Sequence, residues 1–287
     1  MTTRIYYFSA TGNCLAVARQ IANDIGADIV SIAKLDPTER ILIEHERIGL
    51  VFPAYLSPVL GVPLIVERFI SRLDGLQAAE IFAVCTCGGY EVANALAPLE
   101  RIRKLIRACG GALFSAHSVR LPMNNLDYEH IPIPINSDIP KIIENARRKT
   151  AQISNHILQG KGTRFVLAKR IARRLISVIY ALLRGMVMKA LREKAKENAD
   201  DMRSAGYYLP LTDRSILVQE NCIGCGICAK VCPAQNIALQ DGKPAFQHRC
   251  EACFACDEWC PSGAIQHWSR GEGVKYHYPT IQLPDLL

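Results

Sequence analysis

The 287-residue sequence has no uninterrupted apolar run that approaches the roughly 18 residues needed to span a membrane. Its N-terminus also lacks the basic, apolar and small-residue regions of a secretory signal peptide. We therefore expect a cytoplasmic protein in a reducing compartment. With 49% hydrophobic and 21% charged residues, the chain can form one good core and a smaller second module.

The excess of basic over acidic residues is confined to one segment. The formal net charge is +7, but residues 164–197 contain ten basic and two acidic residues, so this segment carries +8 and the remainder carries −1. The protein as a whole is not basic, and we expect no nucleic-acid partner. Apolar residues recur through 164–196 at helical spacing opposite the cations, which predicts a long basic amphipathic helix, or two helices broken near Gly185.

Three interpretations of this helix stay open. It can connect two domains and expose its cations to water, which is the common role of such a surface. It can dock on a membrane surface, because Lys and Arg opposite an apolar stripe are typical of interfacial helices. It can also attract an acidic redox partner.

Eight of the twelve cysteines fall within residues 222–260 in two copies of one spacing. The copies read CIGCGICAKVCP and CEACFACDEWCP, so each is C-x2-C-x2-C-x3-C-P. This is the bacterial ferredoxin pattern, which holds [4Fe-4S] clusters on thiolates. Two residues between cysteines let a tight loop aim three sulfurs at one cube while backbone N–H groups point at the anionic cluster.

In the two-cluster pattern, the fourth cysteine of each run ligates the other cluster. Cluster I is therefore assigned Cys222, Cys225, Cys228 and Cys260. Cluster II is assigned Cys250, Cys253, Cys256 and Cys232. Because the ligands cross, loss of either cluster should disorder both.

Structural zinc and disulfides are the alternatives, but zinc sites usually pair two C-x2-4-C elements and disulfide frameworks suit small secreted domains. The seven histidines show no ligand spacing, and none is assigned a role.

The N-terminal part alternates strand and helix patterns. RIYYFS (4–9) predicts a strand, ATGNC a loop, and LAVARQIANDIG a helix. Further strands are predicted near Ile29 and at 48–52, 81–85 and 112–119, with helices at 62–73, 91–109 and 139–159. This alternation predicts an α/β fold with a doubly wound parallel sheet covered on both faces. Ligands in such sheets bind beyond the carboxyl ends of the strands, which lead here into loops 9–14, 53–61 and 86–90.

The loop at 9–14 feeds a helix N-terminus, whose N–H groups and dipole suit a phosphate. Ser9, Thr11 and Asn13 can add side-chain donors. The loop is not a Walker A motif, because no Gly-Lys-Ser/Thr follows, and it lacks the G-x-G-x-x-G of dinucleotide sites.

An ATGN loop after the first strand, a Pro- and Tyr-containing loop after the third and a Gly-rich loop after the fourth resemble the three FMN-binding loops of flavodoxins. With the tandem ferredoxin pattern, the chain is similar to the flavodoxin–ferredoxin fusion proteins of anaerobic bacteria and archaea. The resemblance implies four parts, which are a flavodoxin-like five-stranded domain (1–160), a basic helical connector (161–212), a small α+β two-cluster ferredoxin (213–270) and a tail (271–287).

The resemblance also implies an FMN site. Its residues would be Ser9, Thr11, Gly12, Asn13, Cys14, Pro53, Tyr55, Thr86, Cys87, Gly88, Gly89 and Tyr90. Cys14 stands where the family usually has Ser or Thr, which replaces a good hydroxyl donor by a weak thiol donor. The loop after Tyr55 carries two prolines and is longer than usual, and LPMNN (121–125) resembles a family segment that borders the flavin.

The implied function is that of an iron-sulfur flavoprotein that relays single electrons between two [4Fe-4S] clusters and FMN. It would link a low-potential donor to an acceptor, both expected to be redox proteins, in anaerobic metabolism. One alternative is a flavin-dependent reductase of a small substrate that uses the clusters as electron input, and another is a redox sensor or scaffold without turnover. No acid/base pair identifies a substrate, so no catalytic residue is assigned.

Overall fold

The computed structural model describes residues 1–57, 60–124, 138–163, 184–198, 203–268 and 275–287. These residues form two compact units. The first consists of Met1–Ser9, Asn13–Pro122 and the described residues of 134–184. The second consists of Ala10–Gly12 and the described residues of 123–133 and 185–287. The division therefore runs through the loop at 9–14, and the tail from 275 onward belongs to the second unit.

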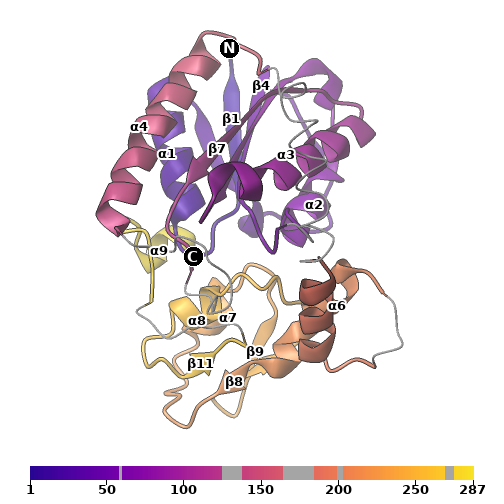
Figure 1. Ribbon diagram of the computed structural model, residues 1–287, viewed down its shortest axis with the longest axis vertical. Coiled ribbons are helices and arrows are strands. Elements are labelled where there is room, and N and C mark those ends of the chain that lie inside the picture. Colours follow the sequence, from indigo (N-terminus) through magenta and orange to yellow (C-terminus); the bar gives the residue numbers. More distant parts are fainter. Residues whose placement is uncertain (58–59, 125–137, 164–183, 199–202, 269–274) are drawn as a thin grey trace. The chain divides into compact units, whose positions relative to one another are not determined.

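The first unit is built around a five-stranded parallel sheet (Figure 1). Its strands are β1 (Thr3–Tyr7), β2 (Asp28–Ser31), β4 (Arg47–Pro53), β6 (Glu80–Cys87) and β7 (Leu113–Arg120). They lie in the order β2-β1-β4-β6-β7, which is 2-1-3-4-5 when the sheet strands are counted along the chain. This is the flavodoxin-like doubly wound order, with its switch point between β1 and β4. The predicted fold of the N-terminal part is confirmed.

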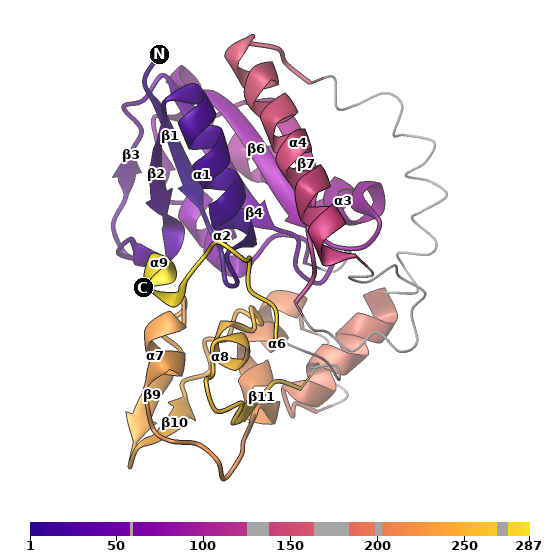
Figure 2. The same cartoon turned by 90° about the vertical axis from the view of Figure 1, so that its left-hand side faces the viewer.

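Helices cover both faces of this sheet (Figures 1 and 2). One face carries α1 (Asn13–Ile25) and α4 (Ile139–Leu158), which pack against each other, and the other carries α2 (Leu64–Ile70) and α3 (Glu91–Ala108). Because both faces are covered, six of the seven residues of β4 are buried. This burial explains why its sequence, RIGLVFP, is a nearly continuous apolar run rather than an alternating one.

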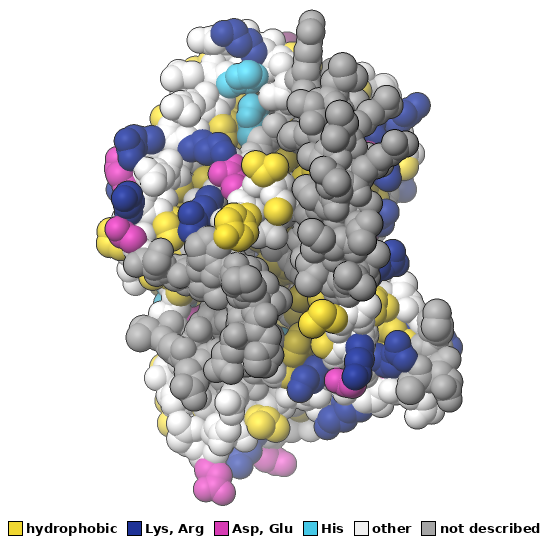
Figure 3. Space-filling view, viewed as in Figure 1, with side chains coloured by type: hydrophobic (Ala, Val, Ile, Leu, Met, Phe, Trp, Pro, Cys, Tyr) yellow, Lys and Arg dark blue, Asp and Glu magenta, His cyan; other side chains and the backbone are white. Residues whose placement is uncertain are grey.

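Short elements complete the first unit. They are η1 (Ile32–Lys34), β3 (Ile41–Leu42), β5 (Leu73–Asp74) and η2 (Leu76–Ala78). β3 and β5 form a two-stranded parallel pair that the sequence did not predict, because two residues are too few for a periodic pattern. On the face shown in Figure 3, Lys and Arg side chains are interspersed with Asp and Glu. In α4, Arg148 and Glu144 form an ion pair whose nitrogen and oxygen are 3.6 Å apart.

The second unit is small and irregular. Its elements are α6 (Ala205–Leu211), η3 (Thr212–Ser215), β8 (Leu217–Val218), α7 (Ile227–Val231), β9 (Ile237–Gln240), β10 (Lys243–Phe246), α8 (Ala255–Glu258), β11 (Ile265–Gln266) and α9 (Leu283–Leu286). β9 pairs with β10 and β8 with β11, both antiparallel. Ile216, Cys228, Ile237 and Ile265 form one of its buried core clusters. The predicted small α+β module is therefore present.

Most of the predicted basic helix, residues 164–183, lies outside the described residues. Residues 184–194 are helical, and the chain after them is attached to η3. Arg214 Nη1 donates to Ala195 O at 2.9 Å and to Glu197 Oε1 at 2.7 Å. Within the part of the chain that the structure describes, no helix combines the length and apolar character needed to cross a membrane.

A histidine pair makes the stability of the first unit depend on pH. The rings of His117 (β7) and His156 (α4) lie with their centroids 5.1 Å apart. Burial lowers the pKa of His117 from 6.5 to about 4, and the nearby charges of His156 and Lys149 lower it further in the same direction. The folded protein therefore holds this imidazole neutral at pH values where the unfolded chain binds a proton.

We expect the first unit to lose stability as the pH falls from about 6.5 towards 4, by at most about 3 kcal/mol. Above pH 6.5 both states hold His117 neutral, so the full stability is present there. Urea unfolding near neutral and near acidic pH will measure this difference. His117→Phe should reduce the pH dependence, whereas the control His45→Phe should keep it. Equal pH dependence in the wild type and in His117→Phe would show that another group is responsible.

Candidate metal centres and flavin loops

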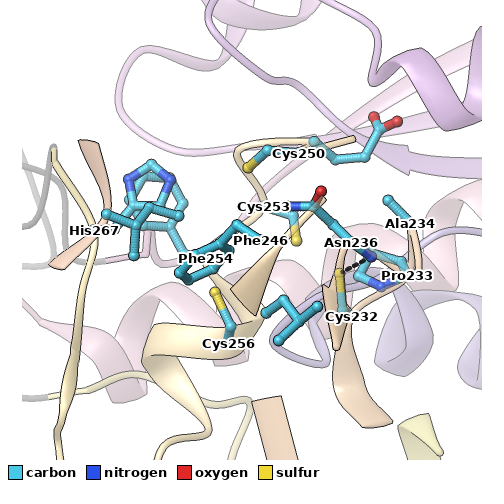
Figure 4. Close-up of a pocket in the computed structure, with 13 residues that line it drawn as sticks. Cys232, Pro233, Ala234, Asn236, Phe246, Cys250, Cys253, Phe254, Cys256 and His267 are labelled. Carbon is cyan, nitrogen blue, oxygen red and sulfur yellow. Dashed lines mark hydrogen bonds between the residues drawn. The ribbon is translucent and has the colours of Figure 1, made fainter. Parts of the chain in front are cut away.

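The eight clustered cysteines line two separate cavities in the second unit. One cavity contains about 310 Å³ of space not filled by protein and is lined by Cys222, Cys225, Cys228 and Cys260. The other contains about 340 Å³ and is lined by Cys232, Cys250, Cys253 and Cys256 (Figure 4). The crossed ligand pattern predicted this same division, with Cys232 and Cys260 each in the cavity of the other run. We call these cavities site I and site II.

Left-handed residues shape the loops that carry the cysteines. In the first run they are Gly224 (φ +67°) and Gly226 (φ +73°), and at the matching positions of the second run they are Ala252 (φ +47°) and Phe254 (φ +65°). A non-glycine residue in this conformation costs about 1–3 kcal/mol and persists only where its surroundings impose it. Both loops therefore have left-handed residues at the same two positions, although only the first loop has glycine there.

Backbone donors at site II suit an anionic iron-sulfur cluster. Asn236 N donates to Cys232 Sγ at 3.3 Å, and Ala252 N donates to Cys250 Sγ at 3.2 Å. Such N–H groups stabilise negative charge on thiolates. The four sulfurs of each site surround a cavity, and among the described residues no three His, Cys, Asp or Glu side chains are placed to hold a single metal ion. This geometry fits a cluster of several atoms.

The two sites differ in their access to water. Cys225 of site I is exposed, whereas burial raises the pKa of Cys250 in site II to about 12 and that of Cys253 well above its ordinary value. In site I, burial opposes ionisation of Cys260, but hydrogen bonds from the Ile265 backbone and other donors outweigh it and lower the pKa of this thiol. Thiols of site II are therefore neutral at ordinary pH unless a metal displaces their protons.

His267 carries no spacing signal in the sequence, yet it lines site II (Figure 4). Its ring centroid is 4.1 Å from that of Phe254, which lines the same cavity. Burial lowers the pKa of His267 to about 3, so the ring stays neutral. It reaches the cavity because β11 ends beside it, which is a consequence of tertiary folding and not of local sequence.

A buried carboxylate also supports site II without a signal in the sequence. Asp213, only 2% exposed, accepts from Asn236 Nδ2 and from His248 N, both at 2.9 Å. Asn236 is the residue whose backbone N–H donates to Cys232. Asp213 therefore orders the segment that presents one site II sulfur, and it adds negative charge next to the site.

In the first unit, the structure brings loops 9–14 and 86–90 together at Cys14 and Thr86. Cys14 Sγ lies 3.0 Å from Thr86 Oγ1, and the thiol is 1% exposed. Burial raises the pKa of Cys14 to about 12, against a smaller opposing effect of the Thr86 hydrogen bond. The thiol that replaces the usual hydroxyl is thus used inside the protein and does not point at a ligand.

Two side-chain donors of loop 9–14, which we call the phosphate loop after its predicted ligand, also form hydrogen bonds within the protein. Thr11 Oγ1 donates to Asn124 Oδ1 at 2.9 Å within the second unit, and Asn13 Nδ2 donates to Pro122 O at 2.8 Å within the first. Gly12 has φ +96°, and α1 begins directly after it at Asn13. The Thr11 hydroxyl therefore serves to shape the loop, and the assignment of loop 9–14 to a phosphate stays a prediction.

The other predicted flavin residues lie at strand ends and in the loops that follow them. Pro53 ends β4, and Tyr55 contacts Phe8 edge to face, with ring centroids 6.0 Å apart. Tyr90, directly before α3, is 60% exposed, so its ring is open to a planar ligand. Asn94 of α3 donates through Nδ2 to Gly88 O at 2.8 Å. Residues 58–59 of the long loop lie outside the described residues.

Cys87 and Gly89 define the shape of this third loop. Burial raises the pKa of Cys87 to about 12, and nearby Glu91 acts in the same direction. Gly89 has φ +62°, a conformation that favours glycine. Cys87 is therefore part of the core at the end of β6, and the assignment of loop 86–90 to flavin binding stays a prediction.

Comparison with known proteins identifies the cysteine-rich part. Residues 214–261 match the family described as "4Fe-4S dicluster domain". No curated protein shows a significant match to the chain.

Several solved structures resemble the N-terminal part weakly. Flavodoxin 1 from Bacillus cereus is 16% identical, covering 55% of this chain and 98% of its own, with a TM-score of 0.37. Megasphaera elsdenii flavodoxin is 18% identical over 52% and 99%, with a TM-score of 0.32. An azoreductase from Bacillus anthracis is 10% identical over 54% and 99%, with a TM-score of 0.38. These likenesses are too weak to carry an argument, so the fold assignment rests on the strand order of the sheet. The chain joins a flavodoxin-like α/β fold to a 4Fe-4S dicluster domain, which is the composition of a flavodoxin–ferredoxin fusion.

Proposed function

We propose that the protein is an electron carrier that passes single electrons between two [4Fe-4S] clusters and FMN. The observation that carries this proposal is the division of eight cysteines over two cavities in the crossed pattern. When bound, each cluster would exchange one electron at a time and FMN would hold one or two. Donor and acceptor are then redox proteins, and the donor is of low potential.

The chain's own residues would hold the clusters at low potential. Asp213, Glu251, Asp257 and Glu258 are buried in the second unit, each at most 4% exposed. Their charge, where ionised, opposes the addition of an electron to a nearby anionic cluster. Asp213 and Glu251 act on Cys250 of site II, where they raise the pKa of the thiol after the larger effect of burial. Site II would therefore hold the cluster that is harder to reduce.

Anaerobic redox titration of the reconstituted full-length protein tests this function. About eight irons and eight sulfides per chain, two EPR-active clusters and one bound flavin are expected. Reversible reduction of all three groups supports a carrier, whereas protein with neither iron nor flavin contradicts it. Flavin reoxidation by a small molecule, with protein acceptors absent, would favour a substrate-specific reductase. Absence of reversible reduction at any accessible potential would favour a sensor or scaffold.

A further inference from the structure

Residues Ala10–Gly12 of the phosphate loop belong to the second unit, and hydrogen bonds hold them there. Trp259 Nε1 donates to Ala10 O, and Tyr278 N donates to Thr11 O, both at 2.9 Å. Two successive carbonyl groups of the loop therefore accept hydrogen bonds from residues in the C-terminal part of the chain.

These bonds determine where the loop's N–H groups point. A trans peptide is planar, so its C=O and the N–H of the next residue point in opposite directions. Trp259, by holding Ala10 O, sets the direction of the Thr11 N–H, and Tyr278 sets that of the Gly12 N–H in the same way. Backbone N–H groups at this position are the ones that a loop before a helix offers to a phosphate.

The residues that hold the loop are attached to cysteines of both sites. Trp259 directly precedes Cys260 of site I. Asn124, whose Oδ1 accepts from Thr11, donates through Nδ2 to the carbonyl of Cys253 in site II at 3.2 Å. The orientation of the loop therefore depends on segments whose own conformation depends on the clusters.

The C-terminal segment keeps the Trp259 ring in place. The His277 ring stacks on it, with centroids 3.7 Å apart and planes at 13°. His277 Nε2 lies 2.8 Å from Glu258 O, and Tyr276 N donates to Glu258 Oε2 at 2.9 Å. Lys275 Nζ donates to Cys260 O. This segment thus fixes the indole from one side and contacts the backbone of a site I cysteine.

We propose that Trp259 is a positioning residue for the phosphate of FMN, and that it links phosphate binding to the cluster-bearing segment. This inference rests on the proposed function, because it requires that FMN binds. Trp259 acts through Ala10 by aiming the Thr11 N–H at the phosphate. Because Trp259 contacts the chain at Ala10, next to the N–H group of Thr11, we expect its effect on the phosphate.

The test compares FMN with riboflavin, which lacks the phosphate. Trp259→Phe removes the N–H donor and keeps an aromatic ring for His277. In full-length, cluster-loaded protein stripped of flavin, this variant should bind FMN about tenfold more weakly and riboflavin as tightly as the wild type does. Quenching of flavin fluorescence measures both affinities. Trp268→Phe is the matched control, because among the described residues Trp268 Nε1 donates no hydrogen bond.

Iron content and near-UV circular dichroism will show whether the variant is folded. If Trp259→Phe does not retain its clusters, His277→Ala replaces it, since this change removes the stacking partner and its contact with Glu258 O but keeps the indole donor, and it should weaken FMN selectively by a smaller factor. Equal weakening of FMN and riboflavin, no weakening of either, or the same loss in Trp268→Phe would overturn the proposal. If the wild type binds neither flavin, the proposed function itself fails, and the inference fails with it.

Discussion

Cys260→Ala should remove iron from both sites, although Cys260 lines only site I. Without this thiolate the site I cluster lacks its fourth ligand. The loop of the first run then loses its support, and that run also supplies Cys232 to site II. We expect the second unit to depend on its metal for folding energy, as other small metal-binding domains do. Iron should therefore fall from about eight to fewer than about two atoms per chain.

Iron and acid-labile sulfide per chain, with visible absorbance, measure this loss. Cys109→Ala is the control, because this cysteine follows α3 in the first unit and its thiol donates to Ile70 O. It should keep full iron content. A Cys260→Ala protein that retains about four irons and an intact single-cluster EPR signal would show that the two sites fold independently.

The cysteine division could be predicted from sequence because the ligand pattern is local. Three cysteines of each site lie within seven residues, and the crossing of Cys232 and Cys260 follows from the chemistry of the paired pattern. The strands of the first unit were predictable for a similar reason, since buried parallel strands such as β4 read as apolar runs. In both cases the signal lies in the segment itself.

Long-range contacts left no such signal. The sequence predicted a tail but not its contact with loop 9–14, where the bond from Tyr278 N to Thr11 O joins residues at opposite ends of the chain. His267 and Asp213 support site II through tertiary contacts that no spacing reveals. The positive φ of Phe254 was also hidden, because a large aromatic residue ordinarily argues against a left-handed conformation.

The phosphate loop has one feature that local sequence predicts and one that depends on long-range contacts. The sequence ATGN predicted a turn before a helix, and Gly12 has the expected left-handed φ of +96°. The hydroxyl of Thr11, however, donates to Asn124 within the protein, because the segment at 122–124 folds back onto the loop. The loop's location was therefore predictable, and the direction of its donors was not.

Gly12→Ala should weaken FMN binding by at least about 100-fold, because two costs act at one atom. At φ +96° any Cβ carries backbone strain of about 1–3 kcal/mol. The added Cβ would also lie 2.8 Å from Ile281 Cβ and 2.9 Å from Ile281 Cγ2, so the loop or the tail has to move. Either movement turns the N–H groups of residues 11 and 12 away from the phosphate.

A double-mutant cycle separates these two costs. Ile281→Gly removes Cβ, Cγ2 and Cγ1 of Ile281, the atoms that the new Cβ would meet, and leaves the strained φ at residue 12, so the double variant should recover part of the lost FMN affinity, about tenfold. Gly26→Ala is the control for strain alone, because Gly26 has φ +68° but no atom within 4 Å of the new Cβ. It should lower thermal stability and leave FMN affinity unchanged. The measurement is the FMN affinity of the four proteins in the cycle, with riboflavin affinity in parallel. It gives the separate contributions of the strain and of the contact with Ile281. If Ile281→Gly restores nothing, the tail does not confine the loop, and backbone strain at Gly12 accounts for the whole loss.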